Sequence, residues 1–137
     1  MRKPSFSDYP TITRRLDAFQ ERAESYGWTN SIDYEKGCMA ILDFIDKGKG
    51  RIVDGYLVMF DVIEPWYSHD KVLQEWLVIK LYDGGSVDSI PPALSELARE
   101  FECKSIISAD SSPIRIMEDA YKRAGFKVLT RSFTKEA

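Results

Sequence analysis

The chain has 137 residues, of which 44% are hydrophobic and 30% charged, a composition typical of one ordinary globular domain over residues 1–137. The net charge of −3 and the scattered Lys and Arg positions argue against a nucleic-acid partner, because phosphate binding requires clustered cations. No apolar run reaches the roughly 18 residues that span a bilayer, and the polar N-terminus does not resemble a secretory signal. We therefore expect a cytoplasmic protein with no membrane partner. In that reducing compartment we expect Cys38 and Cys103 to be reduced core thiols.

The first quarter of the chain predicts a helix. Ser7 or Asp8 can cap its start, Pro10 is tolerated in its opening turn, and Gly27 fits its end. Apolar residues recur between them at helical spacing, at Ile12, Leu16, Phe19, Ala23 and Tyr26. Residues 30–36 add a short second helix to this prediction.

The middle of the chain predicts three strands, at residues 38–45, 51–63 and 72–82. The sequence Asp46-Lys-Gly-Lys-Gly50 reads as a hairpin turn between the first two. The second strand carries apolar residues on both of its faces, which predicts an interior strand covered by helices on each side.

The last part of the chain alternates helices and strands. A loop at residues 83–89 precedes a helix from a Ser89 cap to about Glu102, and a short strand follows at residues 105–109. Ser112 and Pro113 then predict the start of a helix that Gly125 ends, and residues 126–133 predict a final strand. This order predicts an α/β fold with a mixed sheet.

Several segments together resemble the GNAT N-acetyltransferase superfamily. The segment Ala120-Tyr-Lys-Arg-Ala-Gly-Phe126 is similar to the family's closing motif, and Met1-Arg-Lys-Pro-Ser-Phe-Ser-Asp8 to its opening strand and helix cap. Residues 46–55 resemble its hairpin, and residues 76–101 its central strand, loop and helix. The resemblance, which includes small GNAT-like proteins of tailed bacteriophages, implies a twisted, mostly antiparallel sheet flanked by helices on both faces.

The resemblance also implies an acetyl-CoA site. Its residues would be Val78 and Ile79 on the central strand, and the loop residues Asp83, Gly84, Gly85, Ser86 and Val87. This loop departs from the family pattern, because Tyr82 stands at the usual Arg/Gln position and Val87 replaces a small residue. Asp83 and Asp88 add negative charge, and Pro91 and Pro92 remove two N–H donors from the helix start. A plain strand-to-helix turn therefore remains an equal alternative for this loop.

For the chemistry, the resemblance implies that Tyr121 protonates the departing thiolate, and the alternative is a core aromatic. Glu75 is the candidate base, while Asp61 and Glu64 are further candidates, and a solvated strand end is the alternative for each. His69 is the one histidine, so a zinc site is not expected.

Two functions follow. The first is an acetyl-CoA-dependent N-acetyltransferase that transfers an acetyl group to an amine of a small molecule or protein. The alternative is a catalytically inactive GNAT-fold protein for interaction or virion assembly that does not bind coenzyme A. Trp66 and Tyr67 are candidates for a wall of the acceptor site or for a protein contact, and the alternative for both is packing over a sheet edge. The resemblance also implies a candidate homodimer, because family members often pair through their final strands, although residues 126–133 mix apolar and charged side chains and do not decide this.

Overall fold

The computed structural model describes residues 1–27, 30–109 and 116–137. Within these residues, no helix has the length and hydrophobicity that crossing a bilayer requires. The elements are, in chain order, η1 (Phe6–Asp8), α1 (Tyr9–Glu21), η2 (Ala23–Tyr26), α2 (Tyr34–Asp46), β1 (Gly50–Val53), β2 (Tyr56–Ile63), β3 (Val72–Lys80), η3 (Val87–Ser89), α3 (Ile90–Glu100), β4 (Ser105–Ile107) and α4 (Ile116–Arg123).

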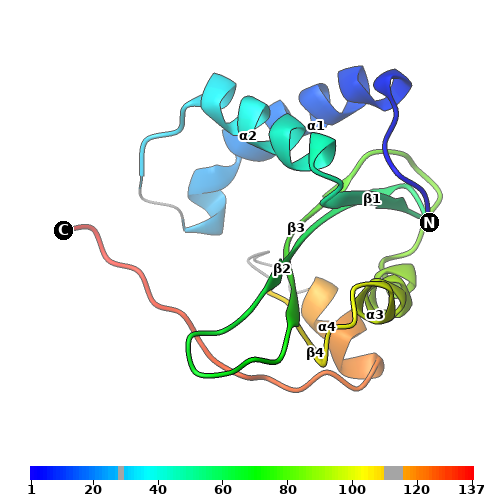
Figure 1. Cartoon of the computed structure of the whole chain (residues 1–137). Helices are drawn as coiled ribbons and strands as arrows, with labels where there is room; N and C mark the ends of the chain where they lie inside the picture. Colours follow the sequence, from blue (N-terminus) through cyan, green and yellow to red (C-terminus); the bar gives the residue numbers. More distant parts are fainter. Residues whose placement is uncertain (28–29, 110–115) are drawn as a thin grey trace.

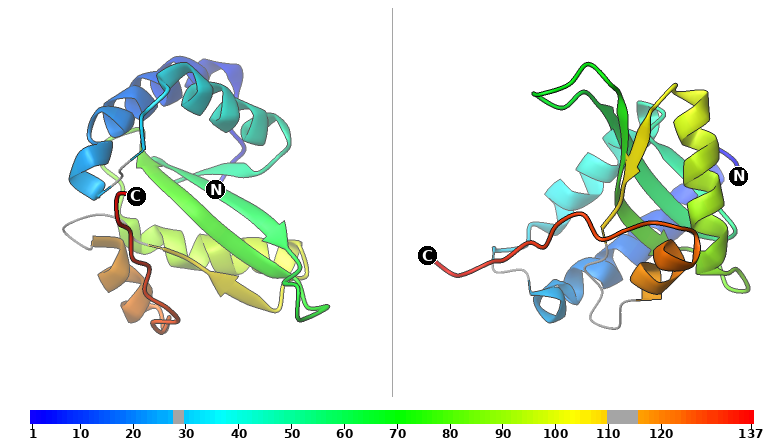
Figure 2. Two further views of the ribbon diagram at one scale, coloured as in Figure 1. Left: turned by 90° about the vertical axis from the view of Figure 1, so that its left-hand side faces the viewer. Right: turned by 90° about the horizontal axis from the view of Figure 1, so that it is seen from below.

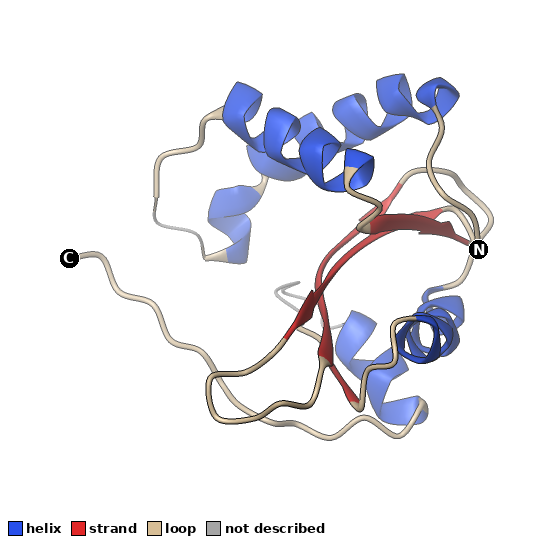
Figure 3. Cartoon of the chain, in the orientation of Figure 1, coloured by secondary structure: helices blue, strands red, loops and turns tan. Residues whose placement is uncertain are grey.

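The four strands form one sheet in the order β1-β2-β3-β4. The first two pairings are antiparallel, and β4 lies parallel to β3. Helices α1 and α2 cover one face of the sheet, and α3 and α4 cover the other (Figures 1 and 3). The predicted fold class, a mostly antiparallel α/β sheet between helices, is confirmed.

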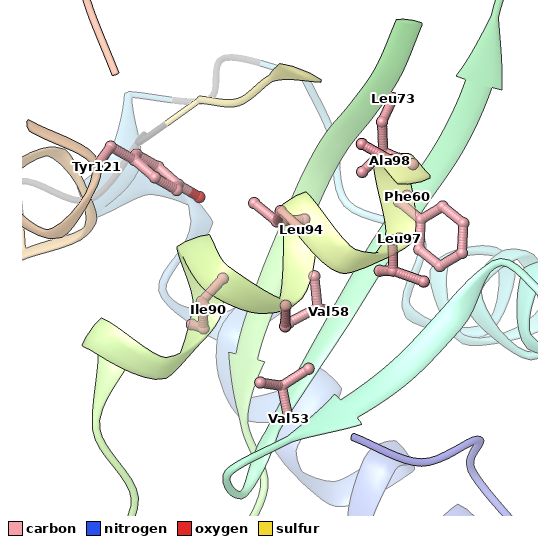
Figure 4. Packing of buried hydrophobic residues seen from close by; sticks show 10 residues of the cluster. Val53, Val58, Phe60, Leu73, Ile90, Leu94, Leu97, Ala98 and Tyr121 are labelled. Carbon is pink, nitrogen blue, oxygen red and sulfur yellow. The ribbon is translucent and has the colours of Figure 1, made fainter. Parts of the chain in front are cut away.

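The sheet separates two hydrophobic clusters, and β2 contributes to both. Leu57 and Met59 pack toward α1 and α2, while Val58 and Phe60 pack toward α3 and Tyr121 (Figure 4). All four β2 side chains are almost completely buried. The interior position predicted for this strand is therefore confirmed. Burying one such side chain contributes about 1.5–3 kcal/mol, so β2 stabilises the packing on both faces of the sheet.

The strand predicted at residues 38–45 is wrong, because this segment lies within α2. Asp33 caps the helix by accepting a hydrogen bond from the Lys36 amide, with a distance of 2.9 Å between oxygen and nitrogen. Ile41 and Ile45, four residues apart, are the buried positions of α2. A short apolar run does not distinguish a strand from a buried helix face, and packing against α1 and the sheet decides for the helix here.

The hairpin turn predicted at residues 46–50 is also wrong, because these residues end α2. Gly48 has a φ of +78°, and the Lys49 and Gly48 amides donate to the Phe44 and Ile45 carbonyl oxygens. This is a Schellman cap, in which a left-handed glycine satisfies the last carbonyls of a helix. The hairpin turn lies later, at Asp54 and Gly55, whose φ values of 47° and 84° fit a two-residue turn.

Other boundaries agree more closely with the sequence. Pro10 lies in the opening turn of α1, and α3 begins directly after Ser89. The strand predicted at residues 105–109 is shorter, at Ser105–Ile107. The predicted helix start at Ser112 and Pro113 lies outside the described residues. Both cysteines are free thiols, as expected.

The final strand predicted at residues 126–133 is absent, and residues 124–137 carry no helix or strand. Figure 2 shows the segment extended. The side chains of Val128, Leu129 and Phe133 are exposed, that of Phe133 by 92%. A strand requires a partner that receives its backbone hydrogen bonds, and no strand pairing of this segment is present in the described part of the chain.

The N-terminal segment is fastened to the sheet by Arg2 and Asp8. The Arg2 and Ile52 backbones exchange two hydrogen bonds. Asp8 is only 2% exposed and accepts two hydrogen bonds from the Arg2 guanidinium, of 2.7 and 2.8 Å. It also accepts from the Ser5 amide at 2.8 Å and from the Tyr82 hydroxyl at 2.7 Å. One buried carboxylate therefore connects the N-terminus to the residue that follows β3 and precedes the loop at 83–87.

This network makes a prediction about acid stability. The Arg2 guanidinium, together with the Ser5 amide and Tyr82 hydroxyl, holds the pKa of Asp8 well below its ordinary value. Because the folded-state pKa is the lower one, Asp8 stabilises the fold above its unfolded pKa of about 3.9, and that contribution falls as the pH drops below about 5. Asp8→Asn should lower the free energy of unfolding by about 2 kcal/mol at pH 7.

Urea unfolding followed by circular dichroism checks this prediction. The difference between the wild type and Asp8→Asn should shrink between pH 5 and about pH 2. Asp43→Asn, which removes one exposed carboxylate from α2, controls for net charge. A difference that stays constant over this pH range would contradict the role assigned to Asp8.

Candidate functional site

Tyr121 is positioned by the way α4 ends. The Phe126 amide donates to the Tyr121 carbonyl oxygen at 3.0 Å, and the Gly125 amide donates to that of Lys122 at 3.1 Å. With Gly125 at a φ of +89°, these bonds form a second Schellman cap, whose usual hydrophobic contact is the 5.1 Å approach of the Tyr121 and Phe126 rings. The motif Tyr-x-x-x-Gly-Phe is therefore a helix stop that fixes the tyrosine ring against its own cap.

Glu75 faces Tyr121 because β3 changes its register at the next residue. Phe60 of β2 pairs with Glu75, but Met59 pairs with Leu77, so Trp76 has no partner in the β2–β3 ladder. This is a β-bulge, which re-aims side chains locally. Trp76 packs its ring 4.9 Å from Phe44 of α2, on the face opposite α4.

The structure brings the two predicted catalytic residues together. The Tyr121 hydroxyl donates to Glu75 Oε2 at 2.6 Å, and the two residues are 6% and 3% exposed. The other carboxylates considered from the sequence lie elsewhere, since Asp61 pairs with Lys49 at 2.9 Å and exposed Glu64 lies 3.2 Å from His69. A phenol and a carboxylate in direct contact can transfer a proton between them.

Strand β4 leaves β3 at the same place. Only Val72, Leu73 and Gln74 of β3 pair with β4, whereas β3 stays paired with β2 as far as Lys80. Beyond Gln74, in the described part of the chain, β3 has no strand on its second side. The Ser108 hydroxyl, just after β4, is buried and has no hydrogen-bond partner among the described residues. Val78 and Ile79, predicted to bind the cofactor, lie on this unaccompanied stretch of β3.

The predicted phosphate loop, residues 83–87, runs from β3 into η3 and α3. Gly84 has a φ of +95°, and a Cβ atom there would meet nothing within 4 Å. Among the described residues, no hydrogen-bond acceptor is found for the amides of Asp83, Gly84, Gly85 and Val87. Amides ahead of a helix N-terminus favour anions, so this loop can offer donors to a phosphate.

The acidic residues of the loop are balanced by cations. Asp88 accepts two hydrogen bonds from Arg123 of α4, at 2.7 and 3.0 Å, and Asp83 lies 3.6 Å from Lys80. Pro91 and Pro92 lie in the first turn of α3, as expected. Asp83 and Asp88 therefore each have a cation nearby.

Two residues that hold the loop were missed by sequence reasoning. Asp54, in the β1–β2 turn, accepts hydrogen bonds from the Ser86 amide and the Ser89 hydroxyl. Asp8 holds the Tyr82 hydroxyl. The Asp54-Gly55 pair is a strong hairpin signal, so the turn could have been found. Its contact with Ser86, 32 residues later, has no local signature.

A separate groove of about 450 Å³ lies between α3, β4 and the segment after α4. Ser95, Arg99, Cys103 and Lys127 are among its lining residues, and none of the predicted site residues is. Burial raises the pKa of the Cys103 thiol, so this groove does not provide an activated nucleophile. The described residues also contain no cluster of three or more His, Cys, Asp or Glu side chains placed to hold a metal ion.

Comparison with solved structures identifies the fold. A predicted acetyltransferase with acetyl-CoA from Clostridium acetobutylicum superposes with a TM-score of 0.66 at 13% identity, covering 98% of this chain and 94% of its own. A probable acetyltransferase gives 0.65 at 11% identity, covering 98% and 95%, and an acetyltransferase from Trypanosoma brucei gives 0.59 at 18%, covering 99% and 97%. No protein-family model and no curated protein matches the sequence. The chain therefore has the fold of the GNAT acetyltransferases over nearly its full length.

Proposed function

We propose that this protein is an acetyl-CoA-dependent N-acetyltransferase that acts on an amine. The observation that carries the proposal is the buried 2.6 Å hydrogen bond between Tyr121 and Glu75 at the point where β4 leaves β3. It provides a proton donor and a proton acceptor next to the part of β3 that, within the described residues, is paired with β2 alone. Similarity of fold is consistent with many activities, so the proposal rests on this site.

Three features support a fit to coenzyme A. In the described part of the chain, the edge of β3 from Trp76 to Lys80 that faces away from β2 pairs with no strand, so its backbone groups can bond the amides of a pantetheine arm. The buried Ser108 hydroxyl offers a further polar contact beside it. The amides of residues 83–85 and 87, ahead of α3, suit a diphosphate. When bound, the cofactor supplies an activated acetyl group as a thioester.

Within this proposal, Glu75 and Tyr121 handle the protons. With an acetyl thioester and an amine bound, Glu75 would accept the proton that the amine nitrogen loses on acylation. Tyr121 would give its hydroxyl proton to the thiolate that leaves. The protonated Glu75 would then return a proton to the Tyr121 oxygen across their hydrogen bond, so the pair would end with the protons it started with. The acceptor is an amine of a small molecule or a protein.

Binding of acetyl-CoA should be detectable as a gain in thermal stability. Acetyl-CoA at about 100 times its dissociation constant should stabilise the fold by about 2.7 kcal/mol, measured by thermal unfolding. ADP, which carries a diphosphate but no pantetheine arm, should stabilise it less at the same concentration. Absence of any stabilisation at millimolar acetyl-CoA would remove the proposed activity.

Loss of the Tyr121 hydroxyl should slow turnover without changing cofactor binding. Tyr121→Phe should lower kcat by about 10²-fold, because it removes the proton donor to the leaving sulfur. The dissociation constant of acetyl-CoA should remain unchanged, since the phenylalanine ring keeps the packing. Steady-state kinetics and calorimetric titration measure the two quantities. The matched control is Tyr67→Phe on the exposed β2–β3 loop, and equal kcat values for both variants would exclude Tyr121 from the mechanism.

The exposed loop between β2 and β3 favours a second candidate function. Trp66 is 96% exposed, and its ring packs edge-on against Tyr67 at 5.5 Å. Aromatic side chains are enriched at protein–protein interfaces, so these two exposed rings can form a protein contact. In this alternative the fold is an interaction module that does not bind coenzyme A, and the acetyl-CoA titration separates it from the enzyme.

A further inference from the structure

Asp54 reaches from the β1–β2 turn into the loop that precedes α3. Its Oδ2 atom accepts a hydrogen bond from the Ser86 amide at 2.8 Å and another from the Ser89 hydroxyl at 2.7 Å. Both bonds therefore end on the same carboxylate oxygen. The other oxygen, Oδ1, has no hydrogen-bond partner among the described residues.

The backbone of the turn supports the same loop. The Gly55 carbonyl oxygen accepts from the Leu81 and Tyr82 amides, at 2.8 and 3.0 Å. A Cβ atom on Gly85 would lie 1.7 Å from the Asp54 carbonyl oxygen, so only glycine fits at this position. The loop at residues 83–87 thus lies directly on the turn, and its shape depends on Asp54 and Gly55.

Asp54 differs from the other acidic residues near the loop in the groups that surround its carboxylate. Asp88 is paired with Arg123 and Asp83 with Lys80, but within the described residues Asp54 has no cation partner and is held by neutral donors. The Ser86 amide, and after it the Ser89 hydroxyl, keep the pKa of Asp54 below its ordinary value. Asp54 therefore remains negative at neutral pH next to the amides that would receive a diphosphate.

We propose that Asp54 is a positioning residue with two opposed effects on the cofactor: its hydrogen bonds fix the phosphate loop, while its charge lowers the affinity for the diphosphate. This inference rests on the proposed function, since it concerns binding of coenzyme A by the same loop. It implies that the loop is already shaped by an internal anion before any ligand arrives. The affinity for the cofactor is then limited by a residue that lies outside the loop itself.

Two substitutions separate the opposed effects. Asp54→Asn can place its amide oxygen where Oδ2 lies and keep both hydrogen bonds while removing the charge. Asp54→Ala removes the hydrogen bonds as well. Calorimetric titration should find that Asp54→Asn binds acetyl-CoA about threefold more tightly than the wild type, or better, because a nearby like charge is lost. Asp54→Ala should bind more weakly than Asp54→Asn.

The controls identify the cause. Acetyl-pantetheine has no diphosphate, so its affinity should be equal in the wild type and Asp54→Asn. Asp43→Asn, with the same change of net charge on the opposite face of the sheet, should leave acetyl-CoA binding unchanged. The gain from Asp54→Asn should also shrink between about 50 mM and 500 mM salt, because exposed charges are screened.

The outcomes are distinct. Equal or weaker acetyl-CoA binding by Asp54→Asn, with binding by the wild type intact, would overturn the inference and leave the proposed function standing. An equal gain for acetyl-pantetheine would also overturn it, because the effect would then not involve the diphosphate. If none of the proteins binds acetyl-CoA, the proposed function fails and the inference fails with it.

Discussion

The structure depends on the unequal pairing of the two sides of β3. One side is bonded to β2 along the whole strand, but the other side meets β4 over only three residues. Backbone N–H and C=O groups that lose a strand partner need another partner. Pairing with β2 keeps β3 extended as far as Lys80, although in the described part of the chain β4 accompanies it only as far as Gln74. The bulge at Trp76 lies next to the point of separation and turns Glu75 toward α4.

The end of α4 at Gly125 was predicted correctly from the sequence because a helix stop depends on local residues, whereas the strand predicted to follow it is absent. Gly125 adopts a positive φ where the helix ends. The cap then holds Tyr121 in the last turn, because the Phe126 amide donates to the Tyr121 carbonyl oxygen. The same local chemistry misled the prediction for residues 46–50, where Gly48 caps α2. A glycine-rich segment indicates that the chain turns, but it does not indicate whether the element that ends there is a helix or a strand.

Long-range packing accounts for the other failures. The apolar run at residues 38–45 becomes a helix because α1 and one sheet face require a helical partner, and this requirement has no trace within the run itself. Residues 126–133 have strand propensity but no partner in the described chain. Glu75 and Tyr121 could each be selected from the sequence, yet their contact depends on a one-residue register shift. Propensity therefore indicates what a segment can form, and neighbouring segments decide what it does form.

The loop at residues 83–87, which matches the family motif least well, is shaped by its contact with the β1–β2 turn. The loop at residues 83–87 lacks the second small residue of the family motif, yet Gly85 is required here by the carbonyl oxygen of Asp54. A glycine in this position is thus needed for contact with the β1–β2 turn whether or not a phosphate is bound. Its presence alone is poor evidence for a ligand. The feature that a diphosphate would use is the set of amides of Asp83, Gly84 and Gly85, which have no acceptor among the described residues and lie ahead of the N-terminus of α3.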